Sequence, residues 1–592
     1  MNKKQQILQI ILLLVSVAYS NIENYLFTEK IEGRIINLSF NFSEDFDDKN
    51  NWSKNEFGYP AFNYLLSLPH DNIVNLKYVS NSNHFLKNFN NEKNHFIEGI
   101  KKNENKSLNE DHVYISEKLI IDKIEYVVLT INPVKLINNQ FRIYNNIEIQ
   151  IELSEDIYDF KILNTSEASS ILTREAIDYE SPVLLIIAPE DNNILNLMNP
   201  FINWKKSKGY TVLYHTLNQT GYTNTEIKSF IQNLYNNGDY PPNYICLVGD
   251  ADGPYAIPTF NENLSIYNGE TDHPYTLLNG NDNISDVSIG RLSIRSLGDL
   301  ATITNKIINY EQYPYLSDNN WFEKALCVGD SAISGLSAII TNQIIAELMV
   351  QYGYNYVIEV YQYPFVNQIE NSINSGVSFY NYRGFSGSSG WQKDSADNLN
   401  NGYMLPFASV ITCDTGSFLE DEESISENFL RAGSISIPKG GIAAVGMSTQ
   451  GTHTMFNNCL DYGLYHGIFV EKINTIGDAV NYAKNNLLLN YPNNPNNYID
   501  IFSHWINLMG DPTLSLWTEE PKELSLILDE TIPFGQNSIN IISNNIDGPV
   551  GRTKISITDS SFNLVAHGIT NELGELILNW DVDSLPIGTY NV

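Results

Sequence analysis

The sequence has few positive charges for its length. Lysine and arginine number 35 among 592 residues, against 69 aspartates and glutamates, which gives a formal net charge of −34. This imbalance argues against a nucleic acid or an anionic membrane surface as a partner. It is typical of a soluble secreted protein, and it leaves many carboxylates able to bind calcium.

Cysteine is also scarce. The four cysteines, at 246, 327, 413 and 459, form no C-x-x-C pair, so the sequence indicates neither a zinc site nor a disulfide scaffold. Cys246 and Cys327 lie inside apolar, strand-like runs, which predicts buried structural roles. Cys413 instead follows such a run, and it is the thiol best placed for chemistry.

Long apolar runs are missing after the first twenty residues. No later segment reaches the ~18 consecutive apolar residues that a membrane span needs, so we expect no span in the mature chain. Residues 1–20 combine Lys3 and Lys4, an apolar run over 7–17 and the small residues Ala18 and Ser20, which is typical of a secretory signal peptide. A membrane anchor is the alternative, but the run is short for one. We therefore expect a secreted or cell-surface protein.

The remaining sequence changes character twice. Residues 21–172 contain "KIEYVVLTINPVKL" and "FRIYNNIEIQIEL", whose period-two alternation predicts an all-β domain. A linker-like segment follows, in which we expect Arg174 to be exposed and open to processing. From residue 182, apolar runs alternate with helical patterns up to a helix expected at 499–509, which predicts an α/β domain with parallel strands.

The α/β region contains an internal echo. "YICLVGDADG" at 244–253 resembles "KALCVGDSAI" at 324–333, with a cysteine inside each strand and Val-Gly-Asp at its end. We interpret this as two related parallel-sheet subdomains, 173–320 and 321–517, although coincidence between two strand ends is the alternative. Residues 523–592 show short strands at immunoglobulin-like spacing. The last residues are strand-like, so we expect this domain to be incomplete.

The stretch "YNYRGFSGSSGW" at 380–391 has the shape of an active-site loop without its chemistry. A strand-like run leads into Gly and Ser, which is typical of a loop whose backbone approaches a ligand. Yet the stretch holds no acid, no general base and no thiol, and Phe385 occupies its middle. No serine has glycine at both −2 and +2, so a serine-hydrolase elbow is not indicated.

"SVITCDTGSF" at 409–418 is the strongest candidate for chemistry. A thiol at the C-terminal end of a parallel strand lies at the sheet edge where ligands bind, and amides of the next turn can hold an oxyanion. A buried structural cysteine is the alternative for Cys413. Asp414 begins the Asp-Thr-Gly-Ser signature of aspartic peptidases, but the sequence has no second copy to complete a carboxylate pair.

Four stretches together resemble the gingipain-type cysteine peptidases, which have a caspase-like fold. They are "YICLVGDADGPYAIP", "NDNISDVSIGRLSIRSLGDLATITNKIINYE", "VITCDTGSF" and "LMGDPTLSLW", and the resemblance covers about 182–517. It implies peptide hydrolysis through a thioester on Cys413, with backbone amides near Gly384 and Cys413 holding the oxyanion and no cofactor needed. The preceding β domain resembles the family's propeptide, a possible inhibitor, and the tail its immunoglobulin-like module.

The chain departs from the family at the general base. The family's Tyr-x-Gly-His-Gly loop corresponds to residues 382–386, so Phe385 stands at the histidine position. Phenylalanine cannot move protons, and loss of acid–base help typically costs ~10²–10⁴-fold in rate. His453, after the next strand, is a possible substitute base or else a surface histidine. Asp286 resembles an acid that orients the family's histidine, whereas His273 is expected to be structural.

The segment "NGNDNISD" at 279–286 is dense in oxygen ligands. It resembles a calcium-bearing loop of the family, with Asp282 and Asp286 as candidate ligands of a structural calcium ion, but it lacks EF-hand spacing. A polar turn is the alternative. Three functions stay open on this sequence: a peptidase acting on a peptide or protein, a sortase or transpeptidase that shares its acyl-enzyme, and an inactive scaffold that binds peptide.

Overall fold

A computed structural model of the chain describes the strands between residues 27 and 164 and then residues 181–592. The second range has gaps at 281, 386–387, 420–421, 492–493, 530, 534–537 and 580–587. The signal segment and Arg174 lie outside the described residues. The chain divides into two compact units, one of residues 1–174, 279–284 and 482–502, and the other of 175–278, 285–481 and 503–592. Within the described residues, no helix combines the length and apolar character that a bilayer crossing requires.

The described residues before 165 form two antiparallel sheets. One contains β1 (Phe27–Glu32), β2 (Ile35–Asn41), β10 (Gln140–Leu153) and β5 (Val74–Lys87) in this order, with β9 (Val134–Ile137) beside β10. The other contains β11 (Ile162–Asn164), β4 (Pro60–Leu68), β8 (Ile124–Ile131) and β6 (Val113–Ile115), with β3 (Ser53–Lys54) beside β4 and β7 (Leu119–Ile121) beside β8. Alternate residues of both sheets, among them Ile149 of β10 and Leu129 of β8, share one buried cluster. This packing explains the period-two pattern of the sequence, because every second side chain of a strand points to the same face of its sheet.

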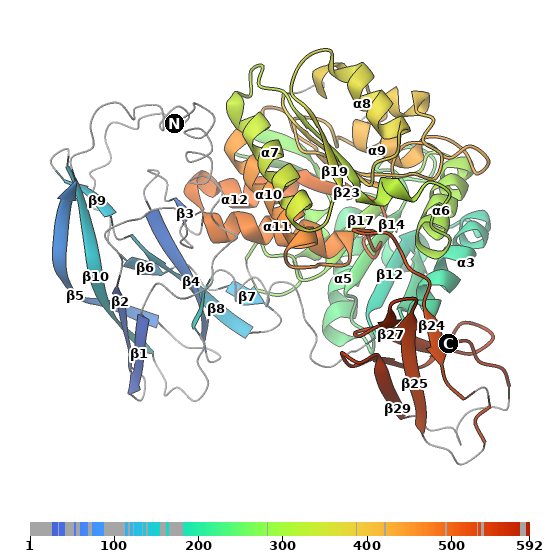
Figure 1. The fold of residues 1–592 in the computed structure, drawn as a ribbon, viewed down its shortest axis with the longest axis horizontal. Coiled ribbons are helices and arrows are strands. Elements are labelled where there is room, and N and C mark those ends of the chain that lie inside the picture. Colours follow the sequence, from blue (N-terminus) through green and yellow to red (C-terminus); the bar gives the residue numbers. More distant parts are fainter. Residues whose placement is uncertain are drawn as a thin grey trace. The chain divides into compact units, whose positions relative to one another are not determined.

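The α/β region contains one continuous sheet of ten strands (Figure 1). Their order is β13 (Thr211–Thr216), β12 (Val183–Ala188), β14 (Tyr244–Val248), β17 (Ser288–Leu292), β23 (Ile506–Met509), β22 (Ala443–Met447), β21 (Phe407–Val410), β20 (Phe379–Arg383), β18 (Lys324–Gly329) and β19 (Tyr356–Val360). All neighbours are parallel except β22 and β23. The two parallel-sheet subdomains expected from the sequence are two parallel halves of this one sheet, which is mixed because β22 and β23 are antiparallel.

Strand β23 makes this join and also corrects the helix expected at 499–509. The helix, α12 (Tyr498–Trp505), ends before β23, and Met509 of β23 pairs with Arg291 on one side and Ala444 on the other. A short apolar run such as "INLM" does not distinguish strand from helix by periodicity. Its partners are distant in sequence, so only the tertiary pairing decides its structure.

The helices alternate with the strands as the apolar pattern predicts. They are α3 (Asn192–Ser207), α4 (Leu217–Thr220), α5 (Asn224–Asn237), α6 (Leu297–Gln312), α7 (Leu336–Gln351), α8 (Phe365–Asn374), α9 (Ile425–Arg431), α10 (Thr454–Phe469), α11 (Ile476–Asn490) and α12, with short 3₁₀ turns η2 (His273–Thr276), η3 (Asn319–Glu323), η4 (Ser388–Gly390), η5 (Ser395–Asn398) and η6 (Pro495–Asn497). Capping boxes begin α5, α6 and α9, where a Ser or Thr N-cap is followed three residues later by Glu or Asp.

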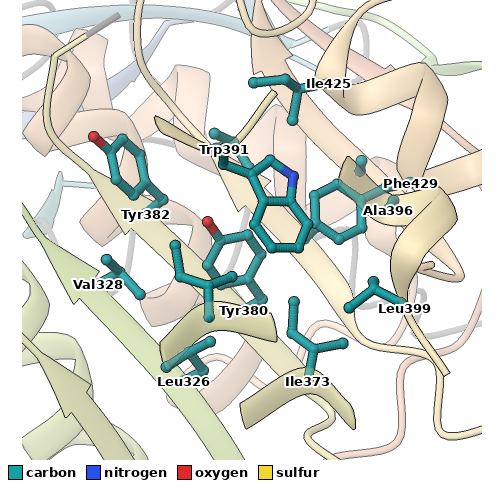
Figure 2. Packing of buried hydrophobic residues seen from close by; sticks show 14 of the residues in the cluster. Leu326, Val328, Ile373, Tyr380, Tyr382, Trp391, Ala396, Leu399, Ile425 and Phe429 are labelled. Carbon is teal, nitrogen blue, oxygen red and sulfur yellow. The ribbon is translucent and has the colours of Figure 1, made fainter. Parts of the chain in front are cut away.

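Successive side chains of β20 point to opposite faces of the sheet and meet different helices. Tyr380 and Tyr382 belong to the apolar cluster that includes residues of α8 and α9 (Figure 2). In this cluster Trp391 stacks on Phe429 of α9 with ring centroids 5.7 Å apart. Asn381 faces the other way, where its amide donates to Asn342 of α7 and Asp461 of α10. One layer is therefore apolar and aromatic, and the opposite layer contains a buried polar network.

The last part of the chain is again β. Its strands are β24 (Ser525–Ile527), β25 (Ser538–Asn545), β26 (Gly548–Pro549), β27 (Lys554–Thr558), β28 (Leu564–Ile569) and β29 (Glu575–Asn579). Strand β28 pairs antiparallel with β27, and β29 pairs antiparallel with β25. A bond from the Ser556 hydroxyl to the Ser207 carbonyl ties β27 to the end of α3. The immunoglobulin-like assignment of this part stays a prediction.

Candidate active site

The two principal candidate positions follow neighbouring strands. Strands β20 and β21 are parallel, with Tyr382 paired to Val410, so their C-terminal ends lie at the same edge of the sheet. Phe385 follows the first strand and Cys413 the second. These two strand ends are therefore adjacent. Cys413 is 8% exposed and Phe385 is 42% exposed, so the thiol lies deep while the phenyl ring faces solvent.

The turn after β21 is held by its own side chains. Asp414 has φ +63°, in the left-handed region that non-glycine residues rarely adopt. Its N–H donates to the Thr449 carbonyl over 3.0 Å, and its carboxylate accepts the Ser417 hydroxyl over 2.7 Å. The Thr415 hydroxyl donates to the Thr412 carbonyl over 2.9 Å. Asp414 is therefore a turn-forming residue here, which accounts for the Asp-Thr-Gly-Ser sequence without aspartic-peptidase chemistry.

A hairpin that the sequence analysis did not anticipate supports this turn. It consists of β15 (Phe260–Leu264) and β16 (Tyr267–Thr271), which pair antiparallel. The buried Glu270 carboxylate accepts the Phe418 N–H over 2.5 Å, and the Thr449 hydroxyl donates to the Asn268 carbonyl over 2.7 Å. The sequence signal was weak, because "FNENL" has three consecutive polar residues between its apolar ends and does not alternate.

The sulfur of Cys413 makes its hydrogen bonds with Thr452. The thiol lies 3.1 Å from Thr452 Oγ1 and accepts the Thr452 N–H over 3.2 Å. The amide of Asn457 donates to the same Oγ1 over 2.8 Å. Thr452 was missed in the sequence, although it stands beside His453.

His453 serves as the N-cap of α10. Its Nδ1 accepts the Met455 N–H over 3.3 Å, its ring lies 5.2 Å from that of Phe456, and burial lowers the pKa of its imidazole. In the part of the chain that the structure describes, no hydrogen bond joins an imidazole to Cys413. The hydrogen bond from Met455 gives His453 a structural role at the start of α10. Its role as a substitute base stays a prediction.

The side chain of Tyr382, two residues earlier, leaves no space for a side chain at Gly384. A Cβ at this position would lie 2.3 Å from the Tyr382 hydroxyl, which also bonds Ser389 Oγ over 2.7 Å. The Gly384 carbonyl accepts the Thr412 hydroxyl over 2.9 Å, which connects the two strand ends. Among the hydrogen bonds of the described residues, none occupies the N–H of Gly384 or of Cys413. Neither amide is engaged within the described residues, and their shared role as an oxyanion site stays a prediction.

The remaining candidates make backbone hydrogen bonds and ring contacts of their own. The buried Asp286 carboxylate accepts the Leu278 N–H over 2.6 Å, and that of Asp282 accepts the Ile284 N–H over 3.0 Å. The described residues contain no group of three or more His, Cys, Asp or Glu side chains able to hold a metal ion. Calcium binding at these two aspartates stays a prediction. His273 is buried, with its ring 4.8 Å from that of His504, as a structural residue would be.

Replacing Thr452 with valine is expected to slow alkylation of Cys413 at neutral pH by roughly three- to tenfold. The change removes the hydroxyl but keeps the shape and the backbone donor, and a typical hydrogen bond contributes about 0.5–1.5 kcal/mol net, which is roughly two- to tenfold in rate. The rate of iodoacetamide labelling of the Cys413 peptide measures this. Thr452→Ser, which keeps the hydroxyl, should label at the original rate. Equal rates in both variants would show that the hydroxyl does not act on the sulfur.

The sequence model of "Peptidase family C25" matches residues 177–517, which is more than half of the chain. The chain belongs to peptidase family C25. Gingipain R2 of Porphyromonas gingivalis is 26% identical over 386 residues, covering 59% of this chain and 50% of the relative. Lys-gingipain HG66 of the same species is 24% identical over 528 residues, covering 79% of this chain and 29% of the relative. The chain thus spans half or less of the length of these relatives.

Solved structures of the family share the fold. The crystal structure of gingipain R, an Arg-specific cysteine proteinase, matches with a TM-score of 0.60 at 23% identity, covering 68% of this chain and 91% of that one. The complex of the pro- and mature domains of a Porphyromonas gingivalis gingipain matches with a TM-score of 0.59 at 22% identity, covering 67% and 93%. The C25 fold therefore carries the site described above, with Cys413 at the end of β21.

Proposed function

We propose that this C25 chain is a gingipain-like cysteine endopeptidase whose nucleophile is Cys413. The observation that supports this is the position of the thiol, at the end of β21 beside the end of β20, within the region that matches the family. The sulfur attacks a peptide carbonyl, the amine leaves with a proton, and water hydrolyses the thioester. The amides of Gly384 and Cys413 hold the oxyanion. Its substrates are peptides or proteins.

Phe385 makes the proton transfers slow. No imidazole follows β20, so neither thiolate formation nor protonation of the leaving amine has the usual help. Peptide binding, which needs only the open amides and the strand ends, can therefore persist where catalysis is weak. This observation favours a second candidate function, a catalytically weak or inactive scaffold that binds peptide or protein.

We further propose that the protein is secreted and that its N-terminal β domain acts as a propeptide-like inhibitor. The apolar start of the sequence supports the first proposal. A linker-like segment around Arg174 supports the second, since a single cut there separates the β domain from the peptidase region. A structural calcium ion at Asp282 and Asp286 belongs to the same set of proposals.

Incubating the full chain with fluorogenic peptides tests the main proposal, before and after limited trypsin treatment. We expect slow cleavage that Cys413→Ala abolishes. Cleavage that persists in Cys413→Ala would overturn the assignment of the nucleophile. If the unmodified chain cleaves nothing, yet binds the peptides equally well with and without Cys413→Ala, the scaffold function replaces the peptidase. Ligated products in the presence of an added amine would indicate transpeptidation.

A further inference from the structure

Arg383, the last residue of β20, is a fully buried cation beneath the candidate site. Its guanidinium donates to the Ile411 carbonyl, two residues before Cys413, and to the Thr454 carbonyl over 3.4 Å, two residues after Thr452. It also donates twice to Asn458 Oδ1, over 2.9 and 2.8 Å. The guanidinium thus joins the two segments that position the sulfur. All these acceptors are neutral.

The charge of Arg383 lacks a close counter-ion. A buried charge is costly unless it is paired. In the described residues no carboxylate lies within ion-pair distance of the guanidinium, and burial lowers the pKa of Arg383. The groups that interact with it electrostatically are Asp461, Tyr382 and Cys413. A buried cation in this situation stabilises any negative charge that forms nearby.

Asp461 competes with the thiol for this cation. It lies on α10, its Oδ2 accepts the Asn381 amide over 3.0 Å, and its Oδ1 has no hydrogen-bond partner in the described part of the chain. Burial raises the pKa of Asp461 to about 7, against the opposing effect of Arg383. Near neutral pH the carboxyl is therefore only partly ionised. The guanidinium is then left without full compensation on this side.

We propose that Arg383 is a positioning residue that stabilises the Cys413 thiolate electrostatically, replacing part of what an imidazolium at position 385 would supply. The inference deepens the proposed function and rests on it, because it assigns a partner to the same thiol. The Ile411 and Thr454 carbonyls that the guanidinium binds lie two residues from Cys413 and from Thr452, and a nearby positive charge favours a negative one. A guanidinium does not give up its proton near neutral pH, so Arg383 assists attack but not departure of the amine. Acyl-enzyme formation therefore stays slow even though the thiol is reactive.

Two substitutions should change thiol reactivity in opposite directions. Arg383→Met removes the cation, so labelling of Cys413 by iodoacetamide at pH 7 should slow by about tenfold and its pH midpoint should rise by about one unit. Asp461→Asn removes the competing anion, so labelling should quicken by roughly threefold. The other titratable groups around the site, Tyr382, Asp414 and His453, are unchanged in both variants. Labelling is followed on the full chain from pH 5 to 9 by mass spectrometry of the Cys413 peptide.

A control variant distinguishes the positive charge of Arg383 from its structural hydrogen bonds. Arg383→Lys keeps the charge but not the paired hydrogen bonds to Asn458, so it should label within about threefold of the unmodified chain. If Arg383→Lys and Arg383→Met are equally slow, or if Asp461→Asn slows labelling as well, Arg383 is a structural brace and the proposal is wrong. Should Arg383→Met fail to fold, the near-unchanged labelling expected of Arg383→Lys and the faster labelling expected of Asp461→Asn still decide the question.

This test does not depend on peptidase activity. Labelling that depends on Arg383 in a chain that cleaves no peptide supports the present inference and contradicts the proposed function. Cleavage that depends on Cys413, with labelling insensitive to Arg383, supports the proposed function and contradicts the inference. The two failures are therefore distinguishable with the same protein preparation.

Discussion

Replacing Phe385 with histidine is expected to raise the rate of peptide hydrolysis by at least about tenfold, the lower part of the range for general acid–base catalysis. Position 385 follows β20, directly beside the strand that ends before Cys413, and its side chain is 42% exposed. An imidazole there has room to titrate near neutral pH and to protonate the leaving amine. Thiol labelling at neutral pH should quicken as well, because an imidazolium favours the thiolate.

Phe385→Leu is the matched control, since it changes the ring but adds no titratable group. It should leave both hydrolysis and labelling within about twofold of the unmodified chain. Hydrolysis is measured on fluorogenic peptides from pH 5 to 9, and only Phe385→His should gain a pH dependence in the range of imidazole titration. Brisk cleavage by the unmodified chain, abolished by Cys413→Ala but not by His453→Ala, would show that another group carries the proton.

The position of the candidate nucleophile was predictable from the sequence because its signals are local. An apolar run followed by a polar, glycine-containing turn marks a strand end, and alternation with helices makes the strands parallel. Parallel strands end at one edge of a sheet, so the pattern places Cys413 and Phe385 at the same edge, and the structure adds that β20 and β21 are neighbours. The repeated Val-Gly-Asp similarly indicated two halves of the α/β domain. It did not indicate that β23 joins them.

What the sequence could not provide depends on pairing across long distances. Strand β23 is a strand only because β17 and β22 lie on either side of it. Glu270 reaches the turn after Cys413 from a hairpin about 150 residues earlier, a separation that no local pattern encodes. Arg383 lies within the loop motif, but nothing in the sequence indicated that it is buried or that residues of α10 bind its guanidinium. Trp391 was expected to end the loop, and the structure shows it in the aromatic core (Figure 2).

A buried ion cluster fixes the end of the peptidase region and leads to the last prediction. Lys205 Nζ lies 2.7 Å from Glu311 Oε2 and 2.6 Å from Asp511 Oδ2, and the lysine side chain is 0% exposed. Lys208 adds a second cation, 2.6 Å from Glu311 Oε1. Asp511 belongs to the "MGDPTLSLW" stretch, so the cluster connects α3, α6 and the segment after β23. Buried charges of this kind are stabilising only as a complete set.

Replacing Lys205 with methionine is therefore expected to lower the free energy of unfolding by about 3–5 kcal/mol, since it leaves two buried carboxylates with one partner. Lys206→Met, on the same helix but only partly buried, should change it by less than about 0.5 kcal/mol. Urea unfolding followed by tryptophan fluorescence measures both, and Trp204 reports locally because its indole donates to Glu311 over 2.8 Å.

The pH dependence distinguishes lost charge from lost packing. Burial alone raises the pKa of Glu311, but the charges of Lys205 and Lys208 outweigh it and lower that pKa from 4.5 to about 2. Because the folded pKa lies below the unfolded one, this carboxylate stabilises the fold fully above about pH 4.5 and loses that contribution as the pH falls toward 2. The deficit of Lys205→Met should therefore shrink between pH 5 and pH 3. A deficit that stays constant over this interval would mean that the lysine stem, and not its charge, holds the three segments together.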